Sequence, residues 1–138
     1  MAHIQRNGLV SGFALGVAIA FFFAGVIRFI PADWLVNPVT RAWLYAAQVP
    51  AGLLFIPVAI ALARARRESP RQVLLWACSG ALAFDGLVLG FWPALYGHEG
   101  LATTIVATLL LWAFAWIVAA ALLFASDRDA PARGQAAG

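Results

Sequence analysis

The chain alternates between long apolar segments and short polar stretches. The apolar segments cover residues 9–30, 39–63, 72–96 and 101–125. The polar stretches read "PADWLVNP" (31–38), "RARRESPR" (64–71) and "GHEG" (97–100). About 20 helical residues cross the hydrocarbon core of a bilayer, so each apolar segment is long enough to span it. Because lipid cannot satisfy open backbone groups, the pattern predicts an all-α fold, an integral membrane four-helix bundle.

Residues 1–126 are predicted to form this single transmembrane domain. Its first apolar segment runs from residue 9 to residue 30. That is longer than the apolar region of a signal peptide, about 7–15 residues, so we expect a retained helix. Residues 127–138 are polar and rich in Ala and Gly, which predicts a disordered cytoplasmic tail.

Charge sets the expected orientation of the bundle. Only 11% of the 138 residues are charged, against about a quarter in soluble domains, and all nine basic residues are arginines. One side would hold Arg6, Arg64, Arg66, Arg67, Arg71, Arg128 and Arg133. The other side would hold only Arg28 and Arg41. Because arginines gather in cytoplasmic loops, we expect both termini in the cytoplasm, and the lipid bilayer rather than nucleic acid as the partner.

Asp85, within "ALAFDGLVLG" (81–90), is the single acidic residue inside an apolar segment. A charged Asp at the bilayer centre costs about 2.5–3.5 kcal/mol, so such residues generally face partners inside a bundle. At about 1.5 Å per helical residue, Gln48 and Thr108 fall at the same depth. Tyr45 lies about one turn higher, and Arg28 is higher still near the end of its segment. These five residues form a candidate polar layer.

Two states of Asp85 follow from its neighbours. If Arg28 or Arg41 meets the carboxyl group, Asp85 stays ionised and the pair ties helices together. If neither does, burial favours the neutral acid, which donates a hydrogen bond or exchanges its proton for a cation. The first state fits a non-enzymatic interaction or accessory component. The second fits a small proton-coupled transporter or exporter in which Asp85 titrates.

Small residues recur at four-residue spacing in the first and third segments. Gly8, Gly12 and Gly16 follow this spacing in the first segment, and Gly86 and Gly90 do so in the third. Such spacing lets two helix backbones approach closely in lipid. We expect these glycines to pack the first helix against the third, or against a second copy in a homodimer or larger membrane complex.

Prolines, aromatic residues and the last polar stretch add local expectations. Pro50 and Pro57 each remove a backbone donor, which predicts a bent second helix. The aromatic residues at the predicted outer helix ends are Trp34, Trp43, Trp92 and Tyr96. Rings at such positions typically anchor at the headgroup level. We expect His98 and Glu99 to be solvated turn residues.

The chain carries no recognisable catalytic signature. It has no Ser/His/Asp order, HExxH motif or phosphate-binding loop, and Cys78 is its only cysteine. We therefore expect no enzymatic activity, no metal site and no cofactor.

The third and fourth segments carry a resemblance to known proteins. They contain "LAFDGLVLGFWPALY" and "LLLWAFAWIVAAALL". With four apolar segments, residues 9–125 resemble a family of small bacterial four-helix membrane proteins of unknown function, which implies the fold and no activity. Small multidrug-resistance exporters are similar in size, but they carry an essential Glu in the first helix, where this chain reads "LVSGFALGVAIAFFFAGVI".

Overall fold

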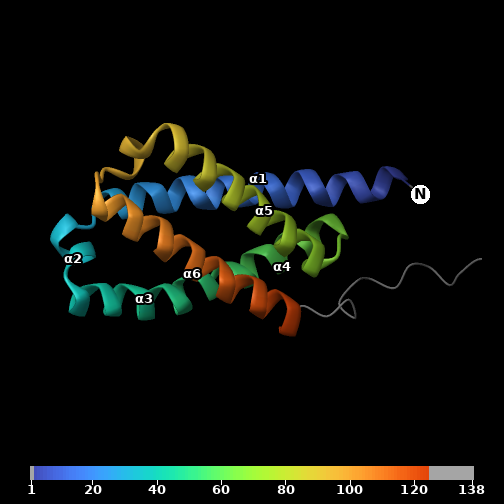
Figure 1. Ribbon diagram of the computed structural model, residues 1–138. Helices are drawn as coiled ribbons and strands as arrows, with labels where there is room; N and C mark the ends of the chain where they lie inside the picture. The colour runs from blue at the N-terminus through green and yellow to red at the C-terminus, as the bar shows by residue number, and fades with distance from the viewer. Residues whose placement is uncertain (1, 125–138) are drawn as a thin grey trace, which may run out of the picture.

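The computed structural model describes the backbone of residues 2–124 and the side chains of residues 9–123 (Figure 1). All regular elements in this range are helical. They are α1 (Ala2–Arg28), α2 (Ala32–Val36), α3 (Pro38–Leu53), α4 (Phe55–Arg66), α5 (Pro70–Phe91), the 3₁₀ helix η1 (Pro93–Tyr96) and α6 (Leu101–Phe124). The predicted tail 127–138, together with Arg128 and Arg133, lies outside the described residues, as does the side chain of Arg6.

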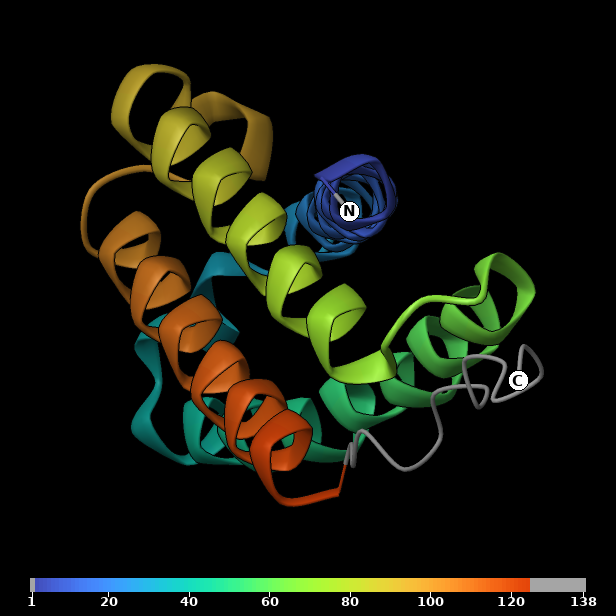
Figure 2. The same ribbon diagram turned by 90° about the vertical axis from the view of Figure 1, so that its right-hand side faces the viewer.

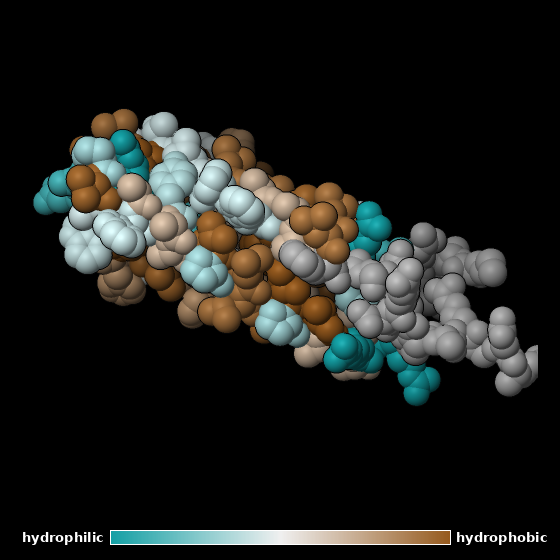
Figure 3. All heavy atoms as spheres, turned by 90° about the horizontal axis from the view of Figure 1, so that it is seen from below, coloured by the Kyte–Doolittle hydropathy of each residue, from teal (hydrophilic) through white to brown (hydrophobic). Residues whose placement is uncertain are grey.

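Four helical stretches are long and apolar enough to cross a membrane. They are Leu9–Arg28, Pro38–Arg66, Pro70–Phe91 and Leu101–Leu123. Figure 3 shows a mostly hydrophobic band between two ends where hydrophilic residues gather. Many large apolar side chains in the band point outward, including Phe21, Leu54 and Leu111, each more than 60% exposed. The expected all-helical fold with four long apolar helices is confirmed.

The third long helix ends earlier than its apolar pattern predicts. α5 stops at Phe91, and Trp92 leaves the helical conformation with φ −144° and ψ 57°. The cause is Pro93, because a proline disfavours the helical conformation of the residue before it. The chain then forms η1 and turns at Gly97, whose φ is 74°. The segment up to residue 96 is therefore not one helix, and Tyr96 belongs to the turn.

The second apolar segment is a bent helix, as its prolines predict. α3 and α4 are separated by Leu54 alone, whose backbone N–H still donates to the Pro50 carbonyl at 3.1 Å. Pro57 lies in the first turn of α4, where its missing N–H is not needed. Its ring displaces the carbonyl four residues earlier, that of Leu53, where α3 ends.

The closest contact in the bundle joins α1 to α5, which run side by side (Figures 1 and 2). A Cβ atom on Gly16 of α1 would overlap the carbonyl group of Ala77 on α5. In return, a Cβ atom on Gly80 of α5 would overlap the carbonyl group of Phe13 on α1. Each helix therefore places a glycine against the backbone of the other, and Gly80 is a contact that the four-residue spacing did not indicate.

The other predicted packing glycines divide into two groups. A Cβ atom on Gly12 would lie 2.8 Å from the Val73 carbonyl oxygen, so Gly12 belongs to the α1–α5 contact. Gly86 and Gly90 have open space around them, and the prediction that they pack against the first helix is wrong. At about 100° per residue, Gly86 lies half a turn away from the face that meets α1. The surroundings of Gly8 lie outside the described side chains.

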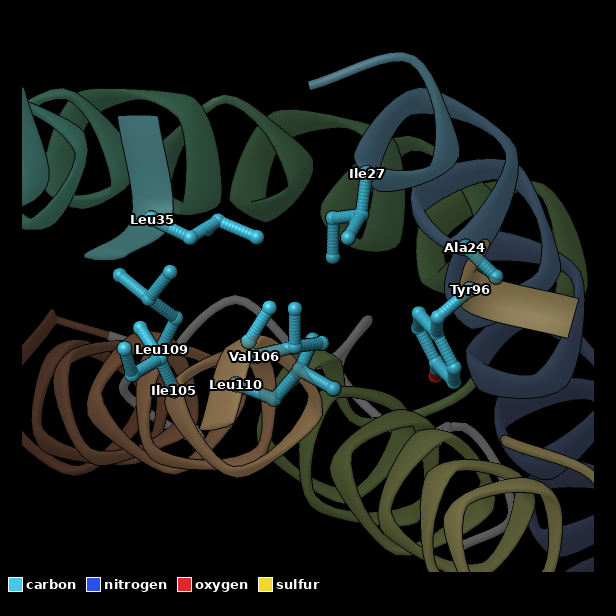
Figure 4. Packing of buried hydrophobic residues seen from close by; sticks show 9 residues of the cluster. Ala24, Ile27, Leu35, Tyr96, Ile105, Val106, Leu109 and Leu110 are labelled. Carbon is cyan, nitrogen blue, oxygen red and sulfur yellow. The ribbon is translucent and has the colours of Figure 1, made fainter. Parts of the chain in front are cut away.

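Two apolar clusters hold the helices together. Near the end that carries α2 and η1, called here the α2 end, Leu35 and a row of α6 residues pack with α1 and η1. Figure 4 shows Ile27 pointing toward the α6 side chains, with Ala24 and Tyr96 next to each other beside it. The second cluster joins α4, α5 and α6 and consists of Ala59, Ala63, Val73, Leu74 and Ala121. α6 contacts both α3 and α5 and lies between them in the bundle.

Candidate functional site

The buried carboxyl group of Asp85 is the centre of the candidate site. Asp85 lies in α5 and is only 4% exposed. It shares a helix face with Ala77 and Ala81, which are also buried, because residues four apart lie one above the other. α5 therefore carries the carboxyl group on the face that it packs into the bundle.

The partner of Asp85 is Tyr96, which the sequence did not indicate. The Tyr96 hydroxyl donates to Oδ1 of Asp85, and Tyr96 is fully buried. The second carboxyl oxygen, Oδ2, is buried and has no hydrogen-bond partner among the residues described. The expectation that Tyr96 is a headgroup-level anchor is wrong, because the turn at η1 points its ring into the bundle. Trp34, Trp43 and Trp92, by contrast, lie exposed.

Neither arginine near the α2 end pairs with Asp85 in the described part of the chain. The only partner of the carboxyl group there is Tyr96. Arg28 lies exposed at the last turn of α1, and its Cγ would be 2.7 Å from a Cβ atom on Gly97. Arg28 therefore packs along the turn after η1. Of the two expected states of Asp85, the ion pair with Arg28 or Arg41 is not formed.

The remaining members of the predicted polar layer lie between α3 and α6. Tyr45 donates to Thr108 Oγ1 at 2.8 Å, and Thr108 donates to the Ile105 carbonyl at 2.8 Å. The indole N–H of Trp112 donates to the Tyr45 carbonyl at 3.2 Å. Gln48 is half-buried, and its Oε1 has no partner within the described residues. The structure thus joins Tyr45 to Thr108 but joins neither of them, nor Gln48, to Asp85.

The predicted layer divides because of the order of the helices. α6 lies between α3 and α5, so side chains on α3 meet α6 first. Equal depth along the chain does not fix which way each helix is rotated. The result is a carboxyl–phenol pair between α5 and η1, and a separate hydroxyl cluster between α3 and α6.

His98 also points inward, contrary to its expected role as a solvated turn residue. It is 6% exposed, and its Nε2 lies 3.0 Å from the Ile27 carbonyl oxygen near the end of α1. Its own carbonyl accepts from the Thr103 hydroxyl at 2.8 Å. Glu99 is exposed, as expected. Two buried polar side chains, Tyr96 and His98, therefore hold the turn between α5 and α6 against the bundle.

The same turn lines an open surface depression of about 460 Å³. Its walls are Leu89, Pro93, Ala94, His98, Glu99, Gly100, Thr103 and Thr104. Apolar side chains form one part of this lining, and a carboxylate, an imidazole and two hydroxyl groups form the other. The depression is open to the surroundings, and its shape depends on the anchored turn.

The electrostatic state of Tyr96 follows from its surroundings. Burial raises the pKa of its phenol above the ordinary value of 10.0, and the hydrogen bond and charge of Asp85 raise it further. Tyr96 therefore remains a proton donor throughout the physiological range. Oδ2 of Asp85 is buried and accepts no hydrogen bond from the described residues. No three potential metal-ligating side chains come together in the part of the chain that the structure describes.

Comparisons with protein-family models, with curated proteins and with solved structures find no match to this chain. The site therefore rests on its own geometry. Tyr96 and His98 were missed because both lie outside the regular helices. The available signal was Pro93, because a proline in this position predicts a turn that carries the next few side chains in a new direction.

Proposed function

We propose that this protein is a non-enzymatic interaction or accessory component of a bacterial inner membrane, in which Asp85 holds the turn between α5 and α6 in place. The observation that supports this proposal most directly is the hydrogen bond between the Asp85 side chain and Tyr96. It joins α5 to the fully buried Tyr96, eleven residues along the chain. A surface formed by that turn is then presented in one fixed shape, as recognition by a partner requires.

The membrane location and the orientation are part of the proposal. Four long apolar helices and the excess of arginines at one end support cytoplasmic termini. A fluorescent protein fused after residue 138 should fluoresce, while alkaline phosphatase fused there should be inactive. Alkaline phosphatase inserted after Gly97 should be active. The opposite pattern would reverse the orientation, and recovery of the chain without detergent would refute the membrane location.

Asp85→Asn tests the structural role of the carboxyl group. This variant keeps the size of the side chain and an oxygen that accepts from Tyr96, so we expect it to retain its melting temperature and oligomeric state. Asp85→Ala removes the acceptor and should lower the melting temperature. A large loss of stability in Asp85→Asn would show that the negative charge itself is required, which contradicts a simple hydrogen-bonded tie.

A second function, proton-coupled transport, has its own supporting observation. Oδ2 of Asp85 is buried without a partner among the described residues, so it offers a place for a proton or a cation. Reconstituted protein would then move protons across vesicles loaded with a pH-sensitive dye, and Asp85→Asn would abolish the flux. Transport is refuted if wild-type vesicles match empty ones and no added cation changes the stability from about pH 5 to about pH 9.

A further inference from the structure

The end of the bundle opposite to the α2 end carries a group of exposed arginines that pair with no carboxylate among the described residues. Arg64 and Arg66 lie in the last turn of α4, and Arg67 follows at its end. All three are exposed, and no ion pair to a carboxylate is formed by them within the described residues. Figure 1 places this turn beside the first half of α1, at the arginine-rich end of the long helices.

The nearest acidic residue in sequence does not neutralise this group. Glu68 turns toward α1, where its Oε2 accepts from the Ser11 hydroxyl at 2.8 Å. Its Oε1 is buried and has no hydrogen-bond partner in the described part of the chain. Glu68 thus points into the protein, whereas the three arginines are exposed. The carboxylate and the guanidinium groups of this short turn are therefore kept apart.

The backbone at Arg67 supports a role for its side chain. Arg67 has φ 56° and ψ 40°, and is the one non-glycine residue with positive φ in the described range. The Glu68 N–H donates to the Ala63 carbonyl at 2.8 Å, which closes the end of α4 in a motif where glycine is the common residue at this position. An arginine here costs backbone energy that a glycine would not. Strain of this kind often accompanies a functional side chain.

We propose that Arg64, Arg66 and Arg67 form a binding surface for the headgroups of anionic phospholipids in the cytoplasmic leaflet. The inference rests on the proposed membrane location and orientation. Guanidinium groups bind phosphate oxygens in a bidentate manner, and basic residues next to a membrane span are attracted to anionic lipid. The headgroup would supply the negative charge for these arginines, because Glu68 points toward α1 and does not pair with them.

The test is the thermal unfolding of the full chain in detergent micelles that contain phosphatidylglycerol or phosphatidylcholine. We expect phosphatidylglycerol to raise the melting temperature more than phosphatidylcholine does. In Arg64→Gln/Arg66→Gln/Arg67→Gln, the phosphatidylglycerol concentration for half of the shift should increase on the order of a hundredfold, from about fivefold for each arginine. Arg28→Gln/Arg41→Gln, at the other end, is the control for a general loss of charge; Arg28 packs along the turn after η1 and Arg41 is half-buried, so we expect a smaller increase than in the triple variant.

A single substitution separates the lipid role from the fold. Arg67→Gly removes the backbone cost, so it should raise the melting temperature in lipid-free micelles while weakening the response to phosphatidylglycerol about fivefold. This variant keeps the proposal testable if the triple variant fails to fold.

Three outcomes would overturn the lipid surface. Equal shifts with the two lipids would exclude headgroup selectivity, and an unchanged response in the triple variant would exclude these arginines. A full shift with inorganic phosphate alone would indicate an anion site rather than a lipid surface. Failure of the membrane location is distinguishable, because the chain would then be recovered from cells without detergent.

Discussion

Helices α1 and α5 meet backbone to backbone, whereas α3 and α6 meet through long side chains. In the first contact Gly16 and Gly80 leave no room for a Cβ atom. In the second contact Tyr45, Thr108 and Trp112 are joined by hydrogen bonds of 2.8 to 3.2 Å. The rings of Tyr45 and Trp112 also lie 5.9 Å apart.

At the proposed membrane location, where water gives no hydrophobic driving force between helices, the two contacts would hold the helices together in two different ways. Close approach gains van der Waals contact along whole turns of backbone, and side-chain hydrogen bonds contribute separately and modestly. The first contact should therefore fail abruptly when an atom is added. The second should weaken by small steps when an atom is removed.

The largest effect is expected for Gly80→Ala. The added Cβ atom meets the Phe13 carbonyl, which belongs to a rigid helix, so we expect a loss of about 3 kcal/mol or more in the free energy of unfolding. Denaturant titration in micelles measures it. Gly86→Ala on the same helix is the control and should be neutral or up to about 1 kcal/mol more stable. Equal losses in both variants would refute the close α1–α5 contact.

Tyr96→Phe should give the next largest effect. The substitution removes the one hydrogen bond that the described residues make to a buried carboxyl group, which costs about 1–3 kcal/mol. The same unfolding measurement applies, and a double-mutant cycle with Asp85→Ala should show that the two losses are not additive. Additive losses would mean that the pair is not formed.

A pH dependence accompanies this pair. The pKa of Tyr96 is raised in the folded state by burial first and by Asp85 second, so the folded protein holds the phenolic proton more tightly than the unfolded chain. Stability from this group is complete below the unfolded value of 10.0 and falls above it, by about 1.4 kcal/mol per pH unit. The slope is obtained by measuring the free energy of unfolding against pH above 10.0 for the wild type and for Tyr96→Phe, and subtracting the second curve from the first. If the two curves have the same slope, Tyr96 lies in water.

The smallest effect is expected for Tyr45→Phe in the α3–α6 contact. It removes one hydrogen bond to Thr108 while keeping the ring against Trp112, and such bonds in membrane helices average about 0.6 kcal/mol. Thr108→Val should cost a similar amount. If Tyr45→Phe costs more than Tyr96→Phe, the ranking of the two contacts is wrong.

Much of the fold could be predicted from the sequence because it depends on long, one-dimensional signals. The four apolar lengths gave the long helices, and Pro50 and Pro57 gave the bend near Leu54. The small α2 helix was not predicted, since five residues are too few to show a periodic pattern. The end of α5 was placed too late because apolar residues continue past Pro93.

The candidate site was only partly predictable. Depth along the helices correctly brought Tyr45 near Thr108, but it gave no information on rotation, so Asp85 was grouped with side chains that it does not meet. The four-residue spacing of glycines identified Gly12 and Gly16 but not Gly80. In α5 that spacing marks Gly86 and Gly90, whereas the face that contacts α1 contains Gly80. Tyr96 and His98 depend on the path of the turn after Pro93; the proline indicates a turn, but not which side chains the turn directs into the bundle.

The paired glycines of α1 and α5 also limit which substitutions the sequence can accept during evolution. Any replacement of Gly16 or Gly80 adds at least one carbon atom, and the opposing carbonyl group has no room for it. No residue is smaller than glycine, so a substitution at either position would remove the close contact between the helices. Among homologous chains, we expect the two glycines to be kept together or to disappear together.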